Sequence, residues 1–206
     1  MEIEYKGANC VVIKDKNAVI VVDPTSNVSV KEADNSEAVI LATQEKFAKS
    51  EREAKNFVID MPGEYEHKDV SVRGIPAHIH TDKGGKRGTM YSIETKDARI
   101  AVVGHTDAPL SDDDLESLGV IDILIIPVGG GGYTLDGRDA ATIVRQISPK
   151  VVIPTHFSDP KIHYDVPQES VEIFVKEIGG DHEKQNSFKI KNMPALTTIF
   201  QLDRTA

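Results

Sequence analysis

The chain has 206 residues and a formal net charge of −9, and 39% of its residues are hydrophobic. That length is enough to bury a sizeable core, and no stretch approaches the roughly 18–20 consecutive apolar residues that cross a bilayer. The acidic balance, the absence of tryptophan and the 5% aromatic content argue against a nucleic-acid surface. We therefore expect neither a membrane nor a nucleic acid as a partner.

The first hundred residues predict mostly β-structure, because short runs rich in valine and isoleucine alternate with turn residues. A polar, helix-compatible stretch at Thr43–Lys55 interrupts this pattern. The predicted strands are Cys10–Ile13, Ala18–Val22, Ala38–Leu41, Phe57–Ile59 and Val70–Ile75, followed by a hairpin of Met90–Ile93 with Ile100–Val103.

From residue 111 onward the pattern changes to alternating helices and strands. Ser111 is expected to cap one helix, Asp136 or Asp139 the next, and Pro167-Gln168 to open a third that ends before Gly179. The predicted strands are Ile121–Ile126, Val151–Ile153, Phe188–Ile190 and Leu196–Leu202. With no linker or repeat, we predict one domain over residues 1–206, of the layered α/β class.

The N-terminus shows no basic region followed by an apolar run, so no signal peptide is expected. Cys10 is the one cysteine, which excludes an intrachain disulfide and a cysteine-rich zinc site. A free thiol is typical of the cytoplasm, which is the expected compartment.

Histidine is the residue type that offers the most chemistry. His105 and His156 each directly follow a predicted strand, and His78 and His80 share one face of an extended segment. Side chains at the ends of neighbouring strands converge in open sheets, and three neutral imidazoles suit Zn²⁺ or another divalent ion. From spacing alone, the alternative of hydrogen-bonded loop histidines stays open.

The glycine run Gly129–Gly132 follows a predicted buried strand. A phosphate-binding loop needs lysine and then serine or threonine after its last glycine, whereas Tyr133 and Thr134 follow here. The run therefore predicts a tight turn where a side chain would clash. No G-x-S-x-G elbow is present, so serine catalysis is not expected either.

Several stretches together resemble one known family. They are MEIEYKGANCVVI followed by AVIVVDP, Pro62–Glu66 (PGEYE), Asp122–Gly130 (DILIIPVGG) with Tyr133–Asp136 (YTLD), and Pro149–Phe157 (PKVVIPTHF). They are similar to compact metallo-β-lactamase-fold proteins, in particular the subgroup of Zn-dependent hydrolases that includes ascorbate-phosphate-lactonase-like proteins. The resemblance implies a four-layer αββα sandwich, in the α/β class.

The same resemblance implies that the family's H-x-H-x-D-H metal signature should follow Ala38–Thr43. At its four positions this chain has Gln44, Lys46, Ala48 and Lys49, so the first metal site and the aspartate that orients the attacking water are expected to be absent. No residue clearly replaces that aspartate as the general base; Asp107 and Glu64 are the candidates.

Other ligand positions of the family are retained in altered form. His156 matches the late histidine, His80 lies near the middle one with His78 in reserve, and His105 stands where the family has a bridging aspartate. The resemblance thus implies a reduced site of three histidines for Zn²⁺ or another divalent metal.

Three hypotheses follow. The first is a divergent metal-dependent hydrolase that acts on an ester, lactone or phosphoester. The second is a non-catalytic binding or structural member, with an anionic small molecule as its partner if Lys46 and Lys49 point into the old site. The third is a homo-oligomeric scaffold in which the site is a relic.

Overall fold

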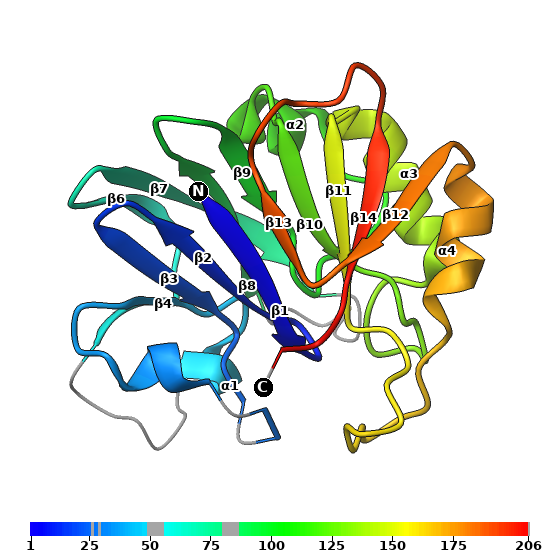
Figure 1. Ribbon diagram of the computed structural model, residues 1–206, viewed down its shortest axis with the longest axis horizontal. Helices are drawn as coiled ribbons and strands as arrows, with labels where there is room; N and C mark the ends of the chain where they lie inside the picture. The colour runs from blue at the N-terminus through cyan, green and yellow to red at the C-terminus, as the bar shows by residue number, and fades with distance from the viewer. Residues whose placement is uncertain (26, 29, 49–55, 80–86, 206) are drawn as a thin grey trace.

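The computed structural model describes residues 1–25, 27–28, 30–48, 56–79 and 87–205. Two β-sheets pack face to face, and helices cover the outer side of the second sheet (Figure 1). This arrangement is the layered α/β architecture that the sequence predicted. Within the described part of the chain, no helix has the length and apolar character needed to cross a membrane.

The first sheet is built mainly from the N-terminal sixty residues. Its strand order is β13-β1-β2-β3-β4-β5. The strands are β1 (Glu2–Gly7), β2 (Cys10–Asp15), β3 (Ala18–Val22), β4 (Val39–Leu41), β5 (Phe57–Ile59) and β13 (Ser187–Lys189). The edge strand β13 comes from the far end of the chain and pairs antiparallel with β1.

The second sheet has the order β12-β14-β11-β10-β9-β8-β7-β6. Its strands are β6 (Gly63–His67), β7 (Val70–His78), β8 (Arg87–Glu94), β9 (Arg99–Val102), β10 (Ile123–Pro127), β11 (Val151–Thr155), β12 (Asp181–Gln185) and β14 (Thr198–Leu202). Strands β9, β10 and β11 are parallel neighbours, so their carboxyl ends meet at one edge of the sandwich.

The helices are short. They are η1 (Lys31–Asp34), α1 (Glu45–Ala48), α2 (Asp112–Leu118), α3 (Gly137–Ile147) and α4 (Val171–Ile178). The predicted N-caps Ser111 and Asp136 are confirmed: Ser111 forms a reciprocal capping box with Asp114, and the Asp136 carboxylate accepts two backbone N–H groups.

Alternation of side chains along the first strands separates two apolar clusters. On β2, Val11 and Ile13 point inward to the core between the sheets, while Cys10 and Val12 point outward. The outward cluster is covered by the connection between β3 and β4, which includes η1. A loop with a single 3₁₀ turn therefore covers this part of the sheet.

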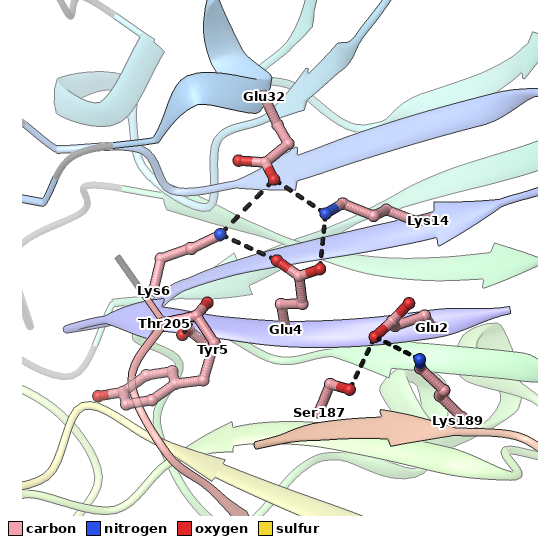
Figure 2. A network of polar contacts seen from close by, with 9 residues as sticks. All are labelled: Glu2, Glu4, Tyr5, Lys6, Lys14, Glu32, Ser187, Lys189 and Thr205. Carbon is pink, nitrogen blue, oxygen red and sulfur yellow. Dashed lines mark hydrogen bonds and ion pairs between the residues drawn. The ribbon is translucent and has the colours of Figure 1, made fainter.

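Four charged side chains fasten η1 to the first sheet, as Figure 2 shows, and we call them the outer-face charge network: Glu4, Lys6, Lys14 and Glu32. The Lys6 ammonium lies 2.9 Å from Glu4 and 3.5 Å from Glu32, and Lys14 lies 2.6 Å and 2.9 Å from the same two carboxylates. Burial raises the pKa of Glu4, but hydrogen bonds from Lys14 and Lys6 outweigh it and leave the pKa lowered. Each buried charge in this network has an opposite charge beside it.

The helix-compatible stretch Thr43–Lys55 forms α1 in its described part, and residues 49–55 lie outside the described residues. One predicted helix start was wrong. Pro167-Gln168 does not open a helix; α4 begins at Val171, with Ser170 as its N-cap. The Glu169 N–H instead donates to the carbonyl of Gly129, which holds this segment extended beside the glycine run.

Candidate functional site

A buried polar clamp joins the two sheets at the edge where the parallel strands end. The Asp23 carboxylate, fully buried just after β3, accepts hydrogen bonds from Asn9 (2.5 Å), from the Thr43 hydroxyl (2.6 Å) and from the Thr43 backbone N–H (2.7 Å). Asn9 in turn accepts from Thr155, the last residue of β11. Burial raises the pKa of Asp23 to about 6, although these hydrogen bonds favour its charged form. The clamp fixes the loops that carry the site.

His105 and His156 come together beside this clamp. His105 follows β9 and His156 follows β11, on either side of β10, and their ring centroids are 5.2 Å apart with the planes at 84°. Only 3% of His105 and 5% of His156 is exposed. The convergence that strand-end positions predicted for these two residues is present in the structure.

The two imidazoles differ in their hydrogen bonding. His156 Nδ1 lies 2.9 Å from the side-chain oxygen of Gln168, which leaves its Nε2 for other contacts. Both ring nitrogens of His105 are buried, and neither has a hydrogen-bond partner among the described residues. Burying an imidazole without hydrogen bonds costs free energy, so we expect a ligand or a solvent molecule to form hydrogen bonds with it.

The electrostatic surroundings keep both imidazoles neutral. Burial lowers the pKa of His105 well below its usual range, and the neighbouring His156 and Lys46 lower it further. Burial also lowers the pKa of His156, with Lys46 acting in the same direction and the hydrogen bond to Gln168 opposing it. A neutral imidazole offers one N–H donor and one lone pair.

Lys46 reaches this pair from α1. Its ammonium lies 4.2 Å from the ring centre of Tyr133 and 4.9 Å from that of Phe47. Those two rings themselves contact His105, at centroid distances of 5.2 Å and 5.5 Å. We call Lys46, His105, Tyr133 and His156 the site cluster.

The charge of Lys46 is not paired with any residue that the structure describes. Its side chain is exposed overall, yet burial of the ammonium lowers its pKa, against the opposing charges of Asp23 and Asp165. No carboxylate of the described residues forms an ion pair with it. Contacts with two aromatic faces stabilise a cation but do not neutralise it. The site cluster therefore carries a net positive charge beside two neutral imidazoles.

The glycine run holds His156 and Tyr133 in place. A Cβ added at Gly129 would lie 1.9 Å from the carbonyl oxygen of His156, so no other residue fits there without a shift of the backbone. His156 itself has φ +50°, a conformation that few non-glycine residues adopt. The predicted tight turn, in which a side chain would clash, is confirmed.

Comparison with known proteins identifies the family. The model of the beta-lactamase superfamily domain matches residues 2–156. The chain belongs to this superfamily. A protein of Lysinibacillus sphaericus named UPF0173 metal-dependent hydrolase is 27% identical over 237 aligned residues, which cover 91% of this chain and all of that protein.

Solved structures of the superfamily share the fold. A putative Zn-dependent hydrolase of the metallo-β-lactamase superfamily from Thermotoga maritima gives a TM-score of 0.76 at 20% identity, covering 98% of this chain and 97% of that one. A putative metal-dependent hydrolase from Parabacteroides distasonis gives 0.59 at 22% identity, covering 78% and 84%. The metallo-β-lactamase fold that the sequence motifs predicted is confirmed.

The structure places the other predicted site residues as follows. His80 and Lys49 lie outside the described residues. His78 ends β7 with its side chain exposed, and Asp107 is exposed as well. Glu64 is exposed on β6 and forms an ion pair with Arg73 at 2.9 Å.

The donors in the described residues do not fit a resident divalent ion. No group of three histidine, cysteine, aspartate or glutamate side chains that could hold a metal occurs among them. Protein sites for zinc supply at least three ligands, whereas His105 and His156 supply two. The third neighbour is Lys46, which has no lone pair while protonated and repels a cation.

Sequence reasoning missed three members of the site. Tyr133, Tyr164 and Gln168 all contact the histidine pair, Tyr164 at a centroid distance of 5.4 Å from His156. Tyr133 had a signal, because it directly follows the glycine run beside His156. No signal in the sequence identified Gln168, because the preceding Pro167 indicated the start of a helix.

Proposed function

We propose that this chain is a divergent member of the metallo-β-lactamase-fold superfamily that binds a small anionic molecule at the site cluster without hydrolysing it. The observation that carries the proposal is the ammonium of Lys46, which has no ion-pair partner among the described residues and lies against Tyr133, the ring that contacts both buried histidines. A cation without a fixed counter-ion raises the local concentration of anions.

The chemistry of the cluster favours an oxyanion such as a carboxylate or a phosphate. Lysine acts on phosphate and carboxylate as a point charge with three N–H donors. The N–H of the neutral His105 ring can donate a further hydrogen bond, because His105 has no partner among the described residues, whereas the N–H of His156 is already donated to Gln168. The loss at Gln44, Lys46 and Ala48 of the residues that the family uses for hydrolysis agrees with binding alone.

Calorimetric titration with inorganic phosphate and with acetate at low salt tests the proposal. We expect the wild-type chain to bind one of these anions with a dissociation constant of about 1 mM or tighter, since the site offers the full charge of Lys46 and the N–H of His105. Lys46→Met should weaken binding at least about tenfold, which corresponds to about 1.4 kcal/mol. Lys16→Met, which removes an exposed lysine in the turn between β2 and β3, should leave the binding unchanged. Failure of both anions to bind would contradict the proposal.

Metal-dependent hydrolysis is the second candidate. The name of the Lysinibacillus sphaericus relative and the two unpartnered nitrogens of His105 favour it. In this case His80, His105 and His156 would hold Zn²⁺ or another divalent ion, and the substrate would be an ester, a lactone or a phosphoester. Metal analysis of the purified chain after addition of Zn²⁺ tests this candidate. One bound ion per chain would support metal-dependent hydrolysis, and only a trace of metal would exclude it.

Two further expectations accompany the proposal. The single cysteine, Cys10, is buried and forms no disulfide, in keeping with the expected cytoplasmic compartment. A homo-oligomeric scaffold stays the third candidate, and gel filtration over a range of concentrations tests it, because a strictly monomeric profile removes it.

A further inference from the structure

The side-chain amide of Gln168 has a defined orientation beside His156. Its nitrogen donates to the carbonyl of Val166 at 3.0 Å, and its oxygen lies 2.9 Å from His156 Nδ1. The reversed amide would set its oxygen against the Val166 carbonyl oxygen, and two acceptors repel each other. A Cβ added at Gly129 would clash with the same amide oxygen, so this oxygen occupies space that only a glycine leaves open. Gln168 therefore presents an acceptor to His156.

This acceptor determines which ring nitrogen of His156 carries the proton. Burial lowers the pKa of His156 and keeps its imidazole neutral, and a neutral imidazole has one N–H and one lone pair. Because Nδ1 faces the oxygen of Gln168, the proton lies on Nδ1. The lone pair then lies on Nε2, which accepts a hydrogen bond and cannot donate one.

The other polar groups of the site cluster are donors. The Lys46 ammonium has three N–H groups and no lone pair, and the neutral His105 ring has one N–H. Lys46 and His156 lie against the same ring, that of Tyr133, with the ammonium 4.2 Å and the His156 centroid 5.8 Å from its centre. The cluster thus combines a positive charge and N–H donors with one uncharged acceptor.

We propose that the site cluster selects an oxyanion that carries an O–H group of its own, with Lys46 binding the negative charge and His156 Nε2 accepting the O–H. Gln168 is the positioning residue that sets this preference, because it fixes the tautomer of His156. An anion without a hydrogen places a lone pair against the lone pair of Nε2 and loses a hydrogen bond.

The inference rests on the proposed function, because it names the class of anion that the site cluster binds. Hydrogen phosphate and hydroxycarboxylates such as glycolate have the required chemistry. Each has a matched anion that lacks the donor. Sulfate has the tetrahedral shape of phosphate but no O–H near neutral pH, and in methoxyacetate a methyl group replaces the hydroxyl hydrogen of glycolate.

Calorimetric titration of the full wild-type chain with phosphate and with sulfate, at neutral pH and equal ionic strength, tests the preference. We expect phosphate to bind at least about tenfold more tightly, since a group left without its hydrogen-bond partner weakens binding by about that factor. Glycolate should exceed methoxyacetate by a similar factor. The tighter of phosphate and glycolate then distinguishes a phosphate from a hydroxycarboxylate as the ligand.

Gln168→Leu removes the acceptor from Nδ1 and lets His156 carry its proton on either nitrogen. The preference for phosphate over sulfate should then fall to about threefold or less. Nitrogen-15 NMR of the imidazoles should show the Nδ1–H form of His156 in wild type and a mixture in the variant. Gln201→Leu is the matched control, because Gln201 contacts His182 Nε2 at 3.1 Å between β12 and β14, and it should leave the preference unchanged.

The outcomes separate this inference from the proposed function. Equal affinity of wild type for phosphate and sulfate overturns the inference alone, as does an Nε2–H form of His156 in the wild-type spectrum. Binding of none of the four anions contradicts the proposed function, and the inference falls with it. If Gln168→Leu fails to fold, the wild-type spectrum and the two matched pairs of anions still test the inference.

Discussion

Two regions of this molecule pack lysine ammonium groups against other side chains, and they do so in opposite ways. In the outer-face charge network, Lys6 is 3% exposed and lies between the carboxylates of Glu4 and Glu32. In the site cluster, the Lys46 ammonium lies on two aromatic rings and has no ion-pair partner among the described residues. The first region is neutral as a unit, and the second is not.

The difference separates structural charge from charge that is available for binding. Removal of one partner from a buried ion pair strongly destabilises the fold, because it leaves an unpaired buried charge. The charges of the outer-face charge network already pair with one another, so they are not available to bind a ligand. Among the residues that the structure describes, the site cluster has a buried imidazole without a hydrogen-bond partner and a cation without a counter-ion, and both are unfavourable. A ligand that supplies the missing partners regains that free energy.

The largest effect is expected in the outer-face charge network. Glu4→Gln leaves the buried Lys6 ammonium with Glu32 alone at 3.5 Å and places an amide N–H₂ beside it. We expect the free energy of unfolding to fall by about 3 kcal/mol, as for other buried pairs that lose one partner. Urea denaturation at neutral pH measures it.

A neighbouring position on the same strand provides the control for Glu4→Gln. Glu2 pairs with Lys189 at 3.3 Å, and the lysine side chain is 59% exposed. Glu2→Gln should therefore lower the free energy of unfolding by no more than about 1 kcal/mol. Equal losses for the two variants would show that the outer-face charge network is not the structural unit described above.

The second effect is a pH dependence that belongs to the site cluster. Because burial lowers the pKa of His105 in the folded state, the unfolded chain takes up the proton first as the pH falls below the usual value of 6.5. Wild type should therefore lose stability below pH 6.5, by up to about 1.4 kcal/mol per pH unit from this one group.

His105→Phe removes that titration. The free energy of unfolding of the variant, relative to wild type, should rise steadily as the pH is lowered from 7.5 to 5.5, and urea denaturation at several pH values measures it. Asp23 titrates in both proteins and cancels from the difference. If the difference in free energy of unfolding between the two proteins did not change with pH, His105 would have a partner in solution that accepts a hydrogen bond from its ring.

The smallest effect is expected at Lys46. Lys46→Met removes an ammonium that is partly desolvated and has no ion-pair partner in the described part of the chain, and methionine keeps the contact with Tyr133 and Phe47. Stability should stay within about 0.5 kcal/mol of wild type or rise slightly. A loss comparable to that of Glu4→Gln would place Lys46 with the structural charges and contradict the comparison drawn here.

Elements with strong local signals were predictable from the sequence. The strand Ala18–Val22 and the end of α3 at Ile147 agree with the expectation, because apolar periodicity and capping residues fix them locally. Strand β12 was missed because its sequence, DHEKQ, has no apolar alternation; it lies at the edge of its sheet and is held there by backbone pairing with β14.

The site was predictable only in part, for the same physical reason. Strand ends pointed to His105 and His156 because parallel strands end at one edge. The approach of Lys46 to Tyr133 joins residues 87 positions apart through the packing of α1, and no local pattern records it. Assignment of a third histidine, His80, stays a prediction.

The pairing of β1 with β13 has a consequence for how the chain reaches its native state. Residues 2–4 have their partners at 187–189, and the N–H of Thr205 donates to the carbonyl of Tyr5. At a synthesis rate of about 5–20 residues per second, the first strand waits roughly 10–40 s on the ribosome before its edge partner emerges. Contacts of such sequence separation also slow folding. Strand β1 is thus synthesised well before its pairing in the sheet can be completed.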